Sequence, residues 1–142
     1  MSSLVIRQFD VGDSEAVVAM WRECGLVVPW NDPWKDIERK RAVQPELFLI
    51  GTVDGVVAAS VMAGYEGHRG WINYLAVSRM FQGRGFGRRM MIAAETVLHA
   101  CGCPKINLQI RSSNIRVMAF YRRLGYTRDD CVSMGKRLVT DG

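Results

Sequence analysis

"FQGRGFGRRM", residues 81–90, places three glycines and three arginines in ten positions, directly after an apolar run. Glycine accepts a positive φ and carries no Cβ that would keep a ligand away from the backbone. The first N–H groups of a helix beginning here have no partner inside that helix, and the helix dipole favours negative charge at this end. The stretch therefore predicts a turn between a strand and a helix that receives a phosphate group.

Two common phosphate-binding loops do not match these residues. A Walker loop needs Gly-Lys followed by Ser or Thr, whereas Arg88 follows the last glycine, Gly87. A dinucleotide-binding fold needs Gly-x-Gly-x-x-Gly and an acidic residue near the end of the next strand. The spacing here is Gly-x-Gly-x-Gly, and "KINLQI" (105–110) contains no acid. Both classes are excluded.

The hydrophobic pattern predicts an α/β protein with a mixed sheet, in the order β-α-α-β-β-β-α-β-α-β, and residues 125–128 can add one more strand. The expected elements are a strand over 4–9, helices over 13–24 and 32–43, strands over 47–53, 56–65 and 71–77, a helix over 87–101, a strand over 105–110, a helix over 117–124 and a strand over 131–138.

Local signals support this order at several points. Asp54-Gly55 between two β-branched runs predicts a tight hairpin. Strands 71–77 and 105–110 flank a long helix, so we expect them to be parallel. The first of them is apolar except for Asn73, which predicts a strand buried on both faces.

Composition indicates one globular domain over residues 1–142. The chain is 49% hydrophobic and 23% charged, with a formal net charge of +5. No apolar stretch approaches the ~20 residues of a membrane span, and "MSSLVIRQFD" does not resemble a signal peptide. We therefore expect a cytoplasmic protein with no membrane partner. Cys101 and Cys103 have no second cysteine pair, so a helix end is expected there and no metal site.

The loop "QGRGFG" (82–87) matches the Gln/Arg-x-x-Gly-x-Gly/Ala loop of the GNAT family of acetyl-CoA-dependent N-acetyltransferases. The strand end "YLAV" (74–77) and the later "NIRVMAFYRRLGY" (114–126) also resemble that family, as does the order of elements. The resemblance covers nearly the whole chain and implies the GNAT fold. More loosely, "PWNDP" (29–33) and "AGY" (63–65) resemble a bacterial subgroup of the YpeA type.

The resemblance implies where the co-substrate acetyl-CoA binds. The backbone at the end of strand 71–77 would pair with the pantetheine arm, the amides of the loop would hold the pyrophosphate, and Asn114 would contact the pantetheine or cap its helix. The residues so assigned are Leu75, Ala76, Val77, Gln82, Gly83, Arg84, Gly85, Phe86, Gly87, Arg88 and Asn114. The alternative is a plain glycine-rich turn.

The resemblance also assigns the acid of the reaction to Tyr121, seven residues after Asn114. A phenol can protonate the sulfur that leaves the thioester. Tyr121 shares a helix face with Val117, Phe120 and Leu124, so the alternative is an aromatic residue of the core.

The base and the acceptor pocket are less defined. A primary amine must lose a proton before it attacks, and strands 71–77 and 105–110 carry no acid. Glu66 is the candidate base, with His68 beside it, although "YEGHRG" (65–70) is equally a polar turn. A water chain or an amine that arrives neutral would also serve. The proposed acceptor pocket consists of Trp30, Asn31, Tyr65, Asn73 and Tyr74, with Trp34 beside them. The alternative is that Trp30 and Trp34 pin the loop to the sheet.

The sequence thus predicts an N-acetyltransferase whose partners are acetyl-CoA and an amine acceptor, either a peptide or a small molecule. A CoA-binding module without catalysis is the alternative, because the expected strand carboxylate is missing. Net positive charge permits a nucleic-acid partner, but no nucleic-acid motif is present and none is expected. By analogy with the family, a homodimer can form through the last strands.

Overall fold

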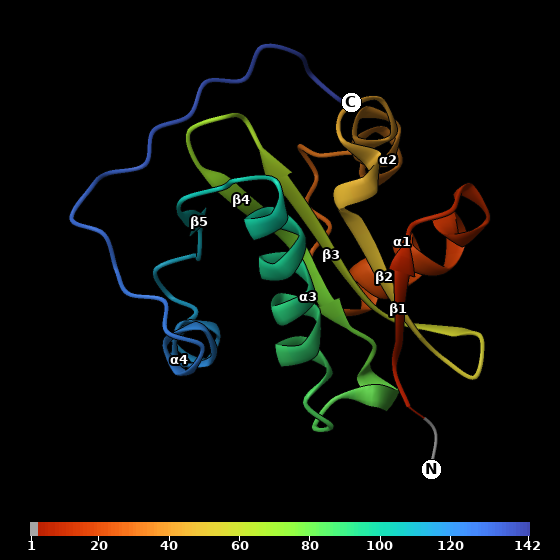
Figure 1. Ribbon diagram of the computed structural model, residues 1–142. Helices are drawn as coiled ribbons and strands as arrows, with labels where there is room; N and C mark the ends of the chain where they lie inside the picture. Colours follow the sequence, from red (N-terminus) through yellow and green to blue (C-terminus); the bar gives the residue numbers. More distant parts are fainter. Residues whose placement is uncertain (1–2) are drawn as a thin grey trace.

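The computed structural model describes residues 3–142, and one mixed sheet forms its centre (Figure 1). Five strands lie in the order β1-β2-β3-β4-β5. They span Val5–Gln8, Phe48–Val53, Val56–Tyr65, Gly70–Val77 and Ile106–Leu108. Strands β1 to β4 pair antiparallel with their neighbours, and β4 and β5 pair parallel, as predicted. The predicted fold class is confirmed.

Helices cover both faces of the sheet. Helices α1 (Ser14–Glu23) and α2 (Pro33–Ala42) pack on one face, while α3 (Phe86–Ala100) and α4 (Ile115–Arg123) pack on the other (Figure 1). Each buries an apolar stripe, because a helix in water is stable only when one side is removed from solvent. The start of α2 follows its sequence signal: the side chain of Asp32 accepts from the N–H of Trp34 at 2.9 Å.

A bulge in β4 is the feature that opens the sheet. Ser60 of β3 faces Ala76 and Met62 faces Asn73, so β4 carries one extra residue between these pairs. Tyr74 lies in the bulge with a φ of 53°, and its carbonyl accepts from the buried Ser60 hydroxyl at 2.8 Å. Pairing of β4 with β5 ends at Ile72. From Asn73 to Val77, the β5 side of β4 therefore has no strand beside it.

The last predicted strand, over 131–138, is wrong, and the further strand at 125–128 does not form either. Residues 131–142, here called the C-terminal arm, run in extended form from α4 across to α2 (Figure 1). Val132 and Met134 are 87% and 92% exposed, so their alternation with polar residues buries no face against a core. Without that burial, the pattern has no energetic reason to become a strand.

Strand β4 also differs from the expectation that both its faces are buried. Trp71 and Asn73 are exposed, whereas Ile72 is buried. The helices α1 and α2 pack over Tyr74 and Ala76, and the earlier part of that face lies beyond them. An apolar run in the sequence cannot report how far a neighbouring helix reaches.

Two further features of the structure relate to predictions made from the sequence. In residues 3–142, no helix combines the length and the apolar character needed to cross a membrane. Cys101 and Gly102, which has a φ of 85°, end α3 as predicted.

Candidate active site

The glycine loop lies between the end of β4 and the start of α3. After a short 3-10 turn (Arg79–Phe81), Gly83 and Gly85 take φ values of 81° and 77°, which an L side chain rarely adopts. At both positions a Cβ would find nothing within 4 Å. The two glycines are therefore required by backbone conformation, and the loop backbone faces open space.

The start of α3 is uncapped in the described chain. Gly85 is the N-cap residue and supplies no side-chain oxygen, and the first backbone bond inside the helix runs from the N–H of Arg89 to Gly85 O, at 3.2 Å. The N–H groups of Phe86, Gly87 and Arg88 precede that bond, so the helix itself offers them no acceptor. These donors and the helix dipole favour an anion at the loop.

Gly87 serves a different purpose from the other two glycines. A Cβ there would come within 3.3 Å of Cζ of Phe120 and 3.7 Å of Cγ2 of Val77. The missing side chain lets α3, α4 and the end of β4 approach one another closely. The structure thereby brings the loop, the strand end and the helix that carries Tyr121 to one place.

The loop arginines divide into two kinds. Arg89 donates to the backbone carbonyl of Leu4 at 3.1 Å and so holds the start of the chain against α3. Arg84 is exposed and lies over the ring of Phe81, 5.4 Å from its centroid, and Arg88 is exposed as well. Arg84 and Arg88 thus make no hydrogen bond or ion pair within residues 3–142, whereas Arg89, also exposed, is held by Leu4.

The end of β4 is tied to the loop through one carbonyl. Val77 O accepts from Nε2 of Gln82 at 2.9 Å and from Sγ of Cys24 at 3.3 Å. Ala76 is buried and pairs with Ser60 of β3. The side chain of Gln82 therefore positions the loop on the strand, a role distinct from the backbone contact expected of it.

Tyr121 and Asn114 both lie on α4. Asn114 caps the helix, because its side chain accepts from the N–H of Val117 at 3.3 Å. Tyr121 is 7% exposed, with the rings of Phe120 and Tyr126 edge-on to it. Burial raises the pKa of Tyr121 to about 12, so its phenol stays protonated at neutral pH. It also lines an open cavity of about 770 Å³ beside β5.

Glu66 and Tyr65 lie at the other end of β4 from the glycine loop. In the turn between β3 and β4, Oε1 of Glu66 accepts from the N–H groups of His68 at 2.6 Å and Arg69 at 2.5 Å. The hydroxyl of Tyr65 donates to the carbonyl of Gly67 at 3.1 Å. Strand β4 has eight residues and spans ~25 Å. The structure therefore does not bring Glu66 or Tyr65 to the loop.

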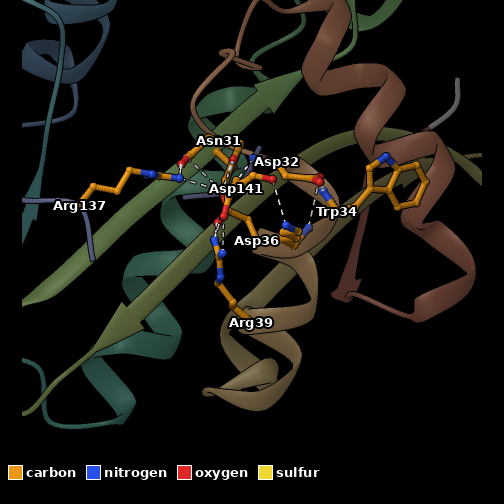
Figure 2. Close-up of polar contacts among 9 residues, drawn as sticks. Asn31, Asp32, Trp34, Asp36, Arg39, Arg137 and Asp141 are labelled. Carbon is orange, nitrogen blue, oxygen red and sulfur yellow. Dashed lines mark hydrogen bonds and ion pairs between the residues drawn. The ribbon is translucent and has the colours of Figure 1, made fainter. Parts of the chain in front are cut away.

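The other predicted acceptor residues lie in β4 and in the loop between α1 and α2. Trp30, in the loop between α1 and α2, has the guanidinium of Arg111 5.8 Å from its ring centroid, so the loops before α2 and before α4 meet here. Asn31 donates to Oδ2 of Asp36 at 3.3 Å (Figure 2). Tyr74 donates to the same oxygen at 2.6 Å. Asn73 is exposed on the same strand.

Asp36 and Asp141 are the site residues that sequence reasoning missed. Asp141, in the C-terminal arm, accepts from Arg39 at 2.5 Å and from the N–H of Asp32 at 2.8 Å (Figure 2). Asp36 stands in the first turn of a correctly predicted helix, but no local signal tells that it faces Tyr74. No sequence signal relates Asp141 to α2, which lies about a hundred residues earlier in the chain.

Comparison with known proteins agrees with this geometry. The acetyltransferase (GNAT) family model matches residues 15–126. An acetyltransferase of Pectobacterium atrosepticum is 47% identical over 136 residues, and one of Yersinia enterocolitica is 46% identical over 136 residues, in both cases over 96% of each chain. Among solved structures, an aminoglycoside N-acetyltransferase in complex with CoA has a TM-score of 0.74 at 16% identity, covering 98% of this chain and 97% of that one.

In this sheet, β4 continues past the end of its pairing with β5, and a glycine loop then leads into α3. This arrangement is that of an acyltransferase fold. The chain belongs to the GNAT family of acetyltransferases. The enzyme class predicted from the sequence is confirmed.

Proposed function

We propose that the protein transfers the acetyl group of acetyl-CoA to a primary amine by direct attack in a ternary complex. One observation carries this proposal: β4 continues past Ile72 without a strand on its β5 side and leads into the glycine loop. An extended pantetheine arm can pair as an added strand with the part of Leu75–Val77 that has no strand beside it, while the loop amides bind the pyrophosphate.

The charge distribution supports a polyanionic co-substrate. Residues 67–128 contain eleven of the 19 Lys and Arg residues, and Glu95 is their one acidic residue. This part of the chain includes β4, the glycine loop, α3 and α4. A concentration of positive charge around an anion site attracts phosphates and speeds their association.

The proposal assigns roles to the residues around the loop. The backbone from Gln82 to Arg88 binds the pyrophosphate, with Arg84 and Arg88 adding charge, and Asn114 holds the start of α4 near the pantetheine. Tyr121 protonates the departing sulfur, and its phenol carries the proton to be donated at neutral pH. The amine enters from the side of Trp30, Asn31 and Tyr74.

The atoms balance without a covalent enzyme intermediate. The amine nitrogen forms a bond to the thioester carbonyl carbon, and the C–S bond breaks when the tetrahedral intermediate collapses. The ammonium loses one proton to a base, and the resulting amine attacks. On collapse the nitrogen loses a second proton, which restores the Tyr121 phenol after that phenol has protonated the sulfur. The CoA sulfur leaves as a thiol.

Two measurements test the proposal. Calorimetry should detect binding of CoA at micromolar to low millimolar concentrations, and free thiol should appear when acetyl-CoA is mixed with the enzyme and a primary amine. Binding without thiol release over a broad panel of amines and peptides would contradict transfer. Absence of binding by well-folded protein would contradict the site itself.

A further inference from the structure

The proposed reaction needs a group that takes a proton from the acceptor ammonium. Strands β4 and β5 carry no carboxylate, and Glu66 lies at the far end of β4 with its Oε1 engaged by two backbone N–H groups. An acid that reaches the open side of β4 must therefore come from another element.

Asp36 of α2 contacts β4 through a hydrogen bond with the Tyr74 side chain. The Tyr74 hydroxyl donates to Oδ2 of Asp36 at 2.6 Å, a short bond of the kind that a carboxylate acceptor forms. Tyr74 stands in the bulge, directly after the last residues of β4 that have β5 beside them. Its ring stacks on Trp21 with 3.8 Å between centroids, and this contact fixes the direction of the hydroxyl.

This pair of side chains remains within reach of solvent. The side chain of Asp36 is 19% exposed, and Tyr74 is partly buried. Asn31 is also partly buried and donates to the same carboxylate oxygen. A proton that arrives at Asp36 therefore has a way out to water, as turnover requires.

The charges around Asp36 come from α2 and from the C-terminal arm. Arg39 donates to Asp36 at 3.1 Å and, with its other nitrogen, to Asp141 at 2.5 Å. The side chain of Asp141 is 2% exposed and is shared by two arginines (Figure 2). The titratable and charged groups of this cluster are Tyr74 on β4, Asp32, Lys35 and Arg39 at α2, and Arg137 and Asp141 in the arm.

The Arg39 guanidinium thus donates hydrogen bonds to Asp141 as well as to Asp36. Without the Asp141 carboxylate, Arg39 would turn to Asp36 alone and compete with the Tyr74 hydroxyl for its oxygens. The arm therefore contacts the acceptor side of the site in two ways, through Arg39 and through Arg137, which donates to Oδ1 of Asn31 at 2.9 Å, although residues 131–140 of the arm are exposed.

We propose that Asp36 accepts the proton of the acceptor ammonium through the Tyr74 hydroxyl, and that Asp141 is a positioning residue that acts through Arg39. This inference rests on the proposed function and names its base. An N–H bond of the ammonium breaks and its proton passes to Oη of Tyr74, while the Tyr74 proton passes to Oδ2 of Asp36. The neutral amine then attacks, and Asp36 releases its proton to solvent.

The test compares Asp36→Asn and Tyr74→Phe with Glu38→Gln. Glu38 lies on the same helix, is exposed and pairs only with Arg41 among the described residues, so its variant is the matched control. The probes are ethylamine, which is protonated at pH 7, and 2,2,2-trifluoroethylamine, which has a similar shape and is largely neutral. We expect kcat/KM for ethylamine at pH 7 to fall about 100-fold in both test variants.

The dependence on protonation separates this role from a structural one. The loss should shrink to less than about threefold for trifluoroethylamine and should diminish for ethylamine as the pH rises, because a neutral amine needs no base. Asp141→Asn should lose about five- to tenfold in kcat/KM for ethylamine with the same pH trend, and Asp141→Glu should restore most of it.

The outcomes distinguish this inference from the proposed function. Calorimetric CoA binding should be unchanged in every variant, and its absence in the wild type would count against the proposed function. If the wild type turns over ethylamine and Asp36→Asn matches Glu38→Gln, the base assignment is wrong. Equal losses with both amines at all pH values would also overturn it, as would a CoA-bound wild type that acetylates neither amine.

Discussion

Tyr121 shows how one residue can belong to the core and still carry a proton. Its ring is buried among aromatic neighbours on α4, as the helix periodicity allows, and the same burial raises its pKa to about 12. A raised pKa favours the neutral phenol in the folded state. The corresponding stability is therefore present below pH ~10 and is lost as the pH rises through the folded-state pKa.

Tyr121→Phe should lower kcat at least about tenfold, because the leaving sulfur then departs without a donor. CoA affinity should change little, since the ring and its packing are kept. Tyr126→Phe is the matched control: it removes a hydroxyl that donates to Glu95 at 2.7 Å, next to the same ring. The measurement is the rate of thiol release by each variant. Full activity in Tyr121→Phe would remove this residue from the mechanism.

The glycine loop acts at the scale of an element, because its backbone conformation and the uncapped end of α3 make one site. Gly83 and Gly85 need positive φ, whereas Gly87 allows close packing against Phe120. The three glycines look alike in sequence. Only the tertiary structure separates the two roles.

Gly85→Ala should weaken CoA binding at least about tenfold, because alanine disfavours the φ of 77° that aims the loop amides. Its conformational cost is about 1 kcal/mol. Gly25→Ala is the control, since Gly25 has a φ of 72° and equally open surroundings at the end of α1. Thermal unfolding should show similar losses for both variants, and calorimetry should show weakened CoA binding for Gly85→Ala alone. Equal CoA affinity in the two would contradict the loop site.

The C-terminal arm links distant parts of the molecule through polar contacts. Its residues 131–140 are exposed, and Asp141 holds its end on α2 through Arg39 and the N–H of Asp32. Hydrogen bonds from Arg39 and from Asp32 lower the pKa of Asp141. A lowered pKa means that this anchoring is present above the ordinary value of ~3.9 and is lost as the pH falls through the folded-state pKa.

Asp141→Asn should free the arm without unfolding the sheet. Limited trypsin digestion, followed by mass spectrometry, should show cleavage after Lys136 and Arg137 at least about fivefold faster than in the wild type. Asp130→Asn serves as the control, because Asp130 is exposed just before the arm and makes no hydrogen bond or ion pair within residues 3–142. Equal cleavage rates in the two variants would show that Asp141 does not hold the arm.

Much of the fold follows from local signals that work in any context. Asp32 with Pro33 starts α2, Asp54-Gly55 makes the hairpin, and the strand-loop-helix order places the glycine loop at the start of α3. These signals were sufficient because capping, turn geometry and helix dipoles depend on residues a few positions apart. They predicted the fold class, while the family was predicted from the resemblance of residues 74–77, 82–87 and 114–126 to known motifs.

The tertiary structure alone decided what depends on residues far apart in the chain. The bulge at Tyr74, the end of pairing after Ile72 and the meeting of Tyr74 with Asp36 arise from strand register and helix packing. The alternation in 131–138 predicted a strand, but burial decides whether such a pattern pairs, and here no core lies beneath it. Local propensity by itself determined most of the helices and strands and the glycine loop, whereas the contact between Tyr74 and Asp36 was determined by long-range packing.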